Sequence, residues 1–117
     1  MTNQEINRFL ALAVGYPHDR VRFFPRDSAA AYVQVLNDYN RGDGPMDYGG
    51  WQRFDHRDTA VIWPIAEQFN AFPKWRYNGA CEFIGWHCWA FCRGYGASEN
   101  PATASAIAVI KYVEGIK

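Results

Sequence analysis

Residues 75–92, WRYNGACEFIGWHCWAFC, decide the fold. Asn78-Gly79 is a typical hairpin turn, and it predicts that residues 75–77 pair with residues 80–84. The aromatic-rich segment 86–92 predicts a further strand. This part of the chain is therefore expected to form an antiparallel sheet, which glycines 94 and 96 are expected to end.

Both ends of the chain predict helices. Thr2 and Glu5 form a capping box, and the apolar positions behind them predict a helix over 3–14. Near the other end, Asn100-Pro101 is a cap followed by proline at the first helical position, and Gly115 closes the predicted helix.

The middle of the chain is less regular. A short strand or extended arm over 21–24 is expected to stop at Pro25. A cap at Asp27 or Ser28 predicts a helix with apolar positions Ala29, Tyr32, Val33 and Leu36. Residues 40–50 are rich in glycine and proline and predict a loop, either a connection or a lid.

A fourth helix is predicted after Asp58 and Thr59. Pro64 lacks an N–H group, so this helix is expected to start late or to kink there. Together these elements predict an α+β fold in one domain over residues 1–117. Its small antiparallel sheet has about three to four strands, flanked by three to four helices.

Composition limits the class of function. The chain has 117 residues, and twelve basic side chains balance twelve acidic ones. A net charge of zero argues against a general nucleic-acid binder, which needs excess positive charge. No apolar run approaches the roughly 18 to 20 residues of a membrane span, and the first residues do not resemble a signal peptide. Aromatic residues make up 17% of the chain, which is typical of a folded protein.

The three cysteines lie close together, at Cys81, Cys88 and Cys92. Their odd number predicts reduced thiols in a cytosol. With His87 they suggest a zinc site, but Cys88 and Cys92 on one strand would lie about 13 Å apart, too far for one metal. We therefore expect three buried thiols and no metal site. No histidine is assigned a catalytic role.

One pattern occurs twice, 31 residues apart. Residues 23–32 and 54–63 share F-x-x-R-D-[ST]-A-x-x-aromatic. Two helix starts would explain it, because Asp, Ser and Thr are favoured there. The alternative is a pair of equivalent sites, each holding an anion with an arginine and a helix N-terminus.

The chain from Phe54 onward resembles the NinX-like and ABA-sandwich small bacteriophage proteins. The resemblance is carried by residues 58–65, Trp89-Ala90 and the closing Asn100-Pro101 with its alanine-rich helix, and Glu5-Ile6-Asn7-Arg8 resembles the family's opening helix. Residues 21–50 have no counterpart. The resemblance implies a phage accessory protein with a compact antiparallel sheet and helices around it, acting in the host cytoplasm. It does not imply an enzyme.

Two functions are open. The first is non-enzymatic sequestration of a nucleotide-derived immune signal, such as a cyclic oligonucleotide or a cyclic ADP-ribose isomer. Arginine contacts phosphate and aromatic rings stack on bases. The candidate ligand-binding residues are Phe24, Arg26, Arg57, Trp63, Trp89, Arg93 and Tyr95. The alternatives without a ligand are that Trp63 and Trp89 lie in the core, and that Arg26 and Arg57 pair with Asp27 and Asp58 or face water.

The second function is inhibition of a bacterial defence complex, such as a CRISPR effector, by protein contact. Trp, Tyr and Arg are the usual anchors of interfaces, so the same composition fits. Under either function we expect no catalytic residues, no cofactor and no membrane contact. Self-association is also expected, because a domain this small cannot bury all its aromatic rings alone.

Overall fold

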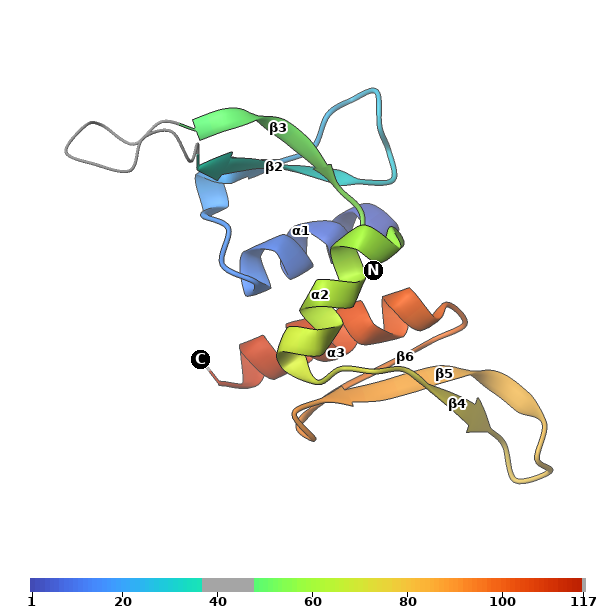
Figure 1. Ribbon diagram of the computed structural model, residues 1–117. Coiled ribbons are helices and arrows are strands. Elements are labelled where there is room, and N and C mark those ends of the chain that lie inside the picture. The colour runs from blue at the N-terminus through green and yellow to red at the C-terminus, as the bar shows by residue number, and fades with distance from the viewer. Residues whose placement is uncertain (37–47, 117) are drawn as a thin grey trace.

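The computed structural model describes residues 1–36 and 48–116. The α+β class is confirmed: two three-stranded antiparallel sheets enclose a layer of helices (Figure 1). Residues 40–47 of the predicted loop lie outside the described residues. The elements are α1 (Asn3–Ala13), a 3-10 turn (His18–Arg20), β1 (Val21–Arg22), β2 (Ala31–Leu36), β3 (Tyr48–Phe54), α2 (Thr59–Phe69), β4 (Lys74–Tyr77), β5 (Phe83–Ala90), β6 (Gly94–Ser98) and α3 (Pro101–Gly115).

The first sheet, β1-β2-β3, is called sheet A. It contains a correction, because residues 31–36 form strand β2 and not the predicted helix. The Asp27 carboxylate accepts the N–H groups of Ala29 and Ala30, as a helix cap would. The chain then pairs with β1 and β3 instead of coiling, so tertiary pairing overrides the local cap. Residues 48–50, predicted as loop, belong to β3.

The second sheet, β4-β5-β6, is called sheet B. The predicted hairpin is present, but its connection runs over the five residues 78–82 and not two, and Trp75 pairs with Trp86. Strand β5 continues through Gly85 and ends at Ala90, two residues before the predicted end. Glycines 94 and 96 do not end the sheet, because both lie in β6.

Close packing between β6 and α3 explains these two glycines. A Cβ atom on Gly94 would lie 2.2 Å from the backbone oxygen of Ala108, and one on Gly96 would lie 2.2 Å from that of Ala104. No side chain fits at either position, so α3 lies directly on one face of sheet B.

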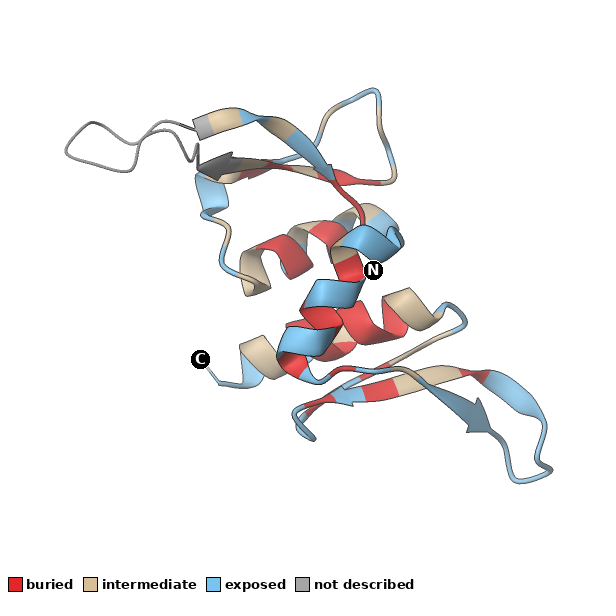
Figure 2. Ribbon diagram, in the orientation of Figure 1, coloured by how far each residue is buried: buried red, intermediate tan, exposed pale blue. Residues whose placement is uncertain are grey.

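Three of the four predicted helix starts are confirmed. Thr2 Oγ1 accepts the N–H of Glu5 and donates to its carboxylate, Asp58 caps α2, and Asn100 caps α3. Helix α2 begins at Thr59 with Pro64 inside it, so it does not start late. The buried residues face the middle layer from the sheets and helices (Figure 2), and the core includes Leu10, Val33, Phe54, Ile62, Val109 and Ile110.

The prediction of three buried thiols is wrong for two of them. Cys88 is buried against α3, and its Sγ lies 3.4 Å from the Ala104 oxygen, whereas Cys81 and Cys92 are exposed in turns. Within residues 1–36 and 48–116, no cluster of three metal-ligating side chains occurs. Over the same residues, no helix is both long and apolar enough to cross a membrane.

Candidate functional site

The face of sheet B that points away from α3 carries exposed rings. The register places Trp89 opposite Tyr95, and their ring centroids lie 4.9 Å apart. His87 lies on the same face, 4.9 Å from the Trp89 ring. Trp89 is 42% exposed and Tyr95 is 40% exposed. The prediction of Trp89 as a possible core residue is therefore wrong, since its ring is available to a ligand.

A pocket of about 300 Å³ opens beside Trp89. Helix α2 ends at Phe69 and is capped by Asn70, whose backbone is left-handed. Residues 71–73 then lead into β4, which pairs with β5. This path brings Phe72 and Lys74 next to Trp89, and Trp63 packs on Phe72 at 5.7 Å. The pocket, called the sheet B pocket, is lined by Asn70, Phe72, Lys74, Cys88, Trp89 and Cys92.

Positive charge beside this pocket is uncompensated. Lys74 lines it and Arg93 lies in the turn that joins β5 to β6. Neither forms an ion pair with any residue in the described part of the chain. In the same turn Phe91 and Cys92 both have left-handed backbones, with φ of 49° and 60°. Non-glycine residues pay for that conformation in strain, and such strain concentrates at functional sites.

The outer face of sheet A carries a second aromatic cluster. Phe24 packs edge-on against Tyr32 at 4.5 Å and Trp51 at 6.0 Å, and the Arg22 guanidinium lies 4.2 Å from the centre of the Trp51 ring. An open hollow of about 700 Å³ lies between Phe24, Pro25, Arg26, Asp27, Tyr32 and Arg53. Here Arg26 has no ion-pair partner among the described residues.

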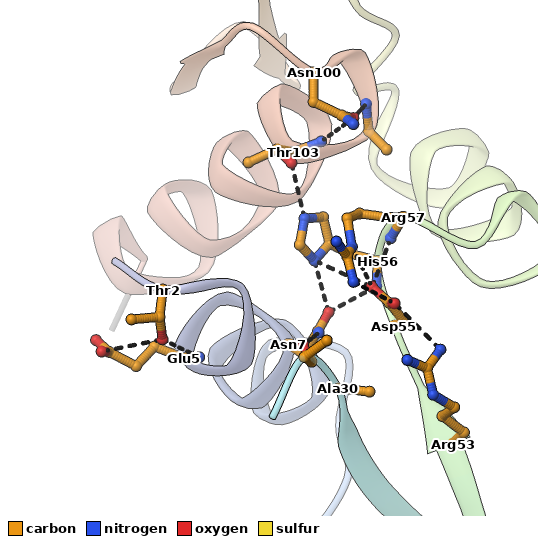
Figure 3. A network of polar contacts seen from close by, with 12 residues as sticks. Thr2, Glu5, Asn7, Ala30, Arg53, Asp55, His56, Arg57, Asn100 and Thr103 are labelled. Atoms are coloured by element: carbon orange, nitrogen blue, oxygen red, sulfur yellow. Dashed lines mark hydrogen bonds and ion pairs between the residues drawn. The ribbon is translucent and has the colours of Figure 1, made fainter. Parts of the chain in front are cut away.

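Four charged residues near sheet A are linked in a chain. Arg53 donates to Asp27 at 2.8 Å and to Asp55 at 3.2 Å. Arg57 also donates twice to Asp55, so that this carboxylate lies between the two arginines (Figure 3). Hydrogen bonds from Arg53 and Tyr32 hold the pKa of Asp27 well below its usual range. Burial alone would raise the pKa of Asp55, but its hydrogen bonds with Arg57 lower it.

A buried polar connection joins α1 to α3 through His56, which is fully buried. The side-chain nitrogen of Asn7 donates to the Ala29 oxygen, so its oxygen accepts from the backbone N–H and the Nδ1–H of His56, each at 2.6 Å. The Nε2 atom of His56 therefore accepts the hydroxyl proton of Thr103, at 2.9 Å.

The chemistry of this connection suits structure more than catalysis. A hydroxyl, an imidazole and an orienting side chain in a row resemble a nucleophile with its base. Burial lowers the pKa of His56 to about 4, against the opposing effect of Asp55. An imidazole of that pKa is neutral at pH 7 and takes up protons poorly, whereas a general base works best near the ambient pH. His56 thus connects α1 with α3.

The seven predicted residues divide into three groups. Trp63, Trp89, Tyr95 and Arg93 lie at or beside the sheet B pocket, and Trp63 is 55% exposed rather than in the core. Phe24 and Arg26 lie at the sheet A hollow, across the helical layer. Arg57 is bound by Asp55 and not by Asp58, which caps α2.

The repeated sequence pattern does not form two equivalent sites. Its second copy begins helix α2, as predicted, whereas its first copy leads into strand β2. Sequence reasoning also missed Phe72, Lys74 and Asn70 in the sheet B pocket. These residues reach the pocket through the pairing of β4 with β5. The two-residue turn expected at residues 78–79 implies a different register from the one observed.

Comparison with known proteins gives limited similarity. LPS-assembly protein LptD from Pseudomonas syringae pv. tomato is 26% identical over 74 residues, which cover 63% of this chain and 8% of LptD. LptD from Pseudomonas fluorescens is 26% identical over 72 residues, which cover 62% of this chain and 7% of that protein. The chain thus spans less than a tenth of these relatives. No family model and no solved structure matches.

Proposed function

We propose that this protein is a non-enzymatic binding protein that sequesters a nucleotide-derived ligand in the sheet B pocket. One observation carries the proposal: the exposed rings of Trp89 and Phe72 share a pocket of about 300 Å³ with the ammonium group of Lys74, which has no ion-pair partner in the described residues. Flat rings beside an unpaired cation suit a ligand that has both a base and a phosphate.

The two halves of such a ligand would be held differently. A base stacked on an aromatic side chain gains about 1 to 3 kcal/mol. Lys74 attracts a phosphate as a point charge, and Arg93 on the adjoining turn can form fork-shaped contacts with phosphate oxygens. A volume of about 300 Å³ lies at the lower end of the range for small-molecule sites.

The biological setting that we propose is phage counter-defence in the host cytoplasm. The ligand class is a cyclic oligonucleotide or a cyclic ADP-ribose isomer, which combines bases with phosphate. The resemblance of the chain from Phe54 onward to small phage accessory proteins supports this setting. The sheet B pocket lies wholly within that part of the chain.

Calorimetry with cyclic di- and trinucleotides and cyclic ADP-ribose isomers tests the proposal. We expect one of them to bind, and Trp89→Ala and Lys74→Ala each to weaken binding at least tenfold. Trp75→Ala is the matched control, because Trp75 is 57% exposed on the same sheet but lies on its opposite face. Chromatography should recover the ligand intact after release. No heat with any ligand, or unchanged binding by Trp89→Ala, contradicts the proposal.

The second candidate function is inhibition of a defence complex by protein contact. It is favoured by exposed rings outside the pocket, at Trp75, Tyr77 and Phe83. Rings of this kind anchor interfaces. A pull-down from host lysate distinguishes the two functions, since a stoichiometric defence protein retained by the wild type and lost with Trp75→Ala supports protein contact.

Self-association is proposed under either function, because Trp75, Tyr77 and Phe83 form an exposed cluster of adjacent rings, and such patches mark interfaces. Light scattering at micromolar concentration tests it. A strict monomer contradicts it.

A further inference from the structure

Strand β4 is an edge strand with an open side. It pairs with β5 on one side only, and all four of its residues are exposed. On its other side, the outward-facing backbone groups of β4 form no hydrogen bond with any described residue. Such an edge is a template for pairing with another chain.

The two faces of β4 differ in chemistry. Lys74 and Arg76 share the face of the sheet B pocket, because Lys74 pairs with His87. Trp75 and Tyr77 are on the opposite face, 57% and 55% exposed. Trp75 packs against Trp86 at 4.5 Å and Phe83 at 4.9 Å. The β4–β5 hairpin extends past the start of α3 (Figure 1), and the rings of Trp75 and Tyr77 remain exposed.

Charge disfavours a second copy of this chain at the edge. Two β4 strands related by a two-fold axis pair antiparallel with the same faces up. In the central register, Lys74 of each copy then faces Arg76 of the other. In the two neighbouring registers, Lys74 faces Lys74 or Arg76 faces Arg76. Like charges directly opposite each other destabilise a strand pair. Neither side chain has an acidic partner among the described residues that would relieve this repulsion.

We propose that the β4 edge binds an extended segment of another protein, which adds a fourth strand to sheet B. The complementary segment carries acidic residues at alternate positions, facing Lys74 and Arg76, and apolar residues between them, packing on Trp75 and Tyr77. Main-chain hydrogen bonds supply affinity in this mode of recognition, and the alternating side chains supply specificity. The proposal shares Lys74 with the nucleotide site, but it needs neither Trp89 nor Phe72.

Peptides of defined pattern test this inference. The probes are a fluorescent seven-residue peptide of alternating valine and glutamate, its counterpart with lysine in place of glutamate, and a glutamate peptide with proline at the central position. We expect the glutamate peptide to bind at least tenfold more tightly than either of the others. Proline weakens binding because it lacks the N–H that the strand pair needs. Amide exchange of residues 74–77 should slow when the peptide binds.

Variants separate this edge from other surfaces. Arg76→Glu should reverse the preference toward the lysine peptide, and Trp75→Ala should weaken binding at least fivefold. Trp89→Ala is the matched control and should leave peptide affinity unchanged. Equal binding of the glutamate and lysine peptides, or an unchanged preference in Arg76→Glu, overturns the proposal. The proposal is also overturned if the protein forms a dimer that Trp75→Ala abolishes, because the edge would then bind a second copy of this chain. All of these measurements are made without nucleotide, so nucleotide binding can succeed or fail without altering their results.

Discussion

The outer faces of sheets A and B use similar residues for different purposes. On sheet A, apart from Arg26, the cations already have partners: the Arg53 guanidinium lies between Asp27 and Asp55, and Arg22 lies over Trp51. The Tyr32 hydroxyl donates to Asp27. On sheet B the rings are exposed, and Lys74 and Arg76 have no acidic partner in the described residues. Rings and cations in the sequence therefore do not by themselves mark a site. What marks one is whether the fold has already satisfied them.

The largest expected effect is on the buried connection beneath sheet A. Replacing His56 by alanine leaves the Thr103 hydroxyl without its acceptor, removes a donor from Asn7 and opens a cavity. We expect a loss of roughly 3 to 5 kcal/mol of unfolding free energy, measured by urea denaturation. His18→Ala is the control, because His18 is exposed and bonds only to Arg8, and its cost should stay below about 1 kcal/mol. Equal costs for the two variants would remove His56 from this role.

The same residue predicts a dependence of stability on pH. Burial lowers the pKa of His56 from 6.5 to about 4 in the folded chain. Between these values the unfolded chain binds more protons, so the unfolding free energy falls as pH drops from 6.5 to 4, by about 3 kcal/mol. The stability that the lowered pKa values of Asp27 and Asp55 provide is lost only below about pH 5, where the unfolded carboxyls begin to take up protons. The slope between about pH 5 and pH 6.5 should vanish in His56→Gln.

The next effect concerns the contact beneath sheet B. Gly96→Ala places a methyl group against the backbone of α3, so the helix must move away from β6. We expect a loss of about 2 to 3 kcal/mol, measured as a shift in the urea midpoint. Gly50→Ala in sheet A is the control, since nothing lies within 4 Å of the added methyl group. A neutral Gly96→Ala would show that this contact is not tight.

A smaller effect tests the comparison of the two sheets directly. Arg53→Ala on sheet A removes two charge-assisted hydrogen bonds and should cost about 1 to 2 kcal/mol of unfolding free energy. Arg76→Ala on sheet B removes an exposed cation without a described partner and should stay within about 0.5 kcal/mol. Urea denaturation of both variants measures these losses. Similar losses of unfolding free energy would contradict the difference that we infer between the two sheets.

The smallest effect is a gain in stability. Cys92 has a left-handed backbone with φ of 60°, which glycine adopts without strain. We expect Cys92→Gly to raise the unfolding free energy by about 0.5 to 1 kcal/mol in thermal melts, because relief of strain outweighs the added freedom of the unfolded chain. Cys92→Ser keeps the strain and should give no gain. If both variants melt alike, strain at Cys92 is not relieved by glycine.

The local parts of the fold could be predicted from the sequence. The caps at Thr2, Asp58 and Asn100 are satisfied within a few residues of each side chain, so short motifs suffice to find them. Strand β2 could not be found this way. Asp27 makes the contacts of a helix cap, and only the pairing of β2 with β1 and β3 decides that a strand follows.

The candidate site was predicted in part for the same reason. Strand alternation places Trp89 and Tyr95 opposite each other, and both residue types already suggested a ligand. Phe72 and Lys74 reach the pocket only through the register that the five-residue connection sets between β4 and β5. Arg53 was not predicted because its partner Asp27 lies far away in the sequence. The two residues meet only because β2 pairs with β3.

The unequal exposure of the three thiols provides two natural reporters. Cys81 lies in the connection beside the β4 edge and Cys92 lines the sheet B pocket, while Cys88 between them is shielded by α3. A thiol-reactive dye will therefore label either end of β5 without entering the core. Protection of Cys92 by a nucleotide, or of Cys81 by a peptide, would tell from one labelling reaction which end of the sheet is occupied.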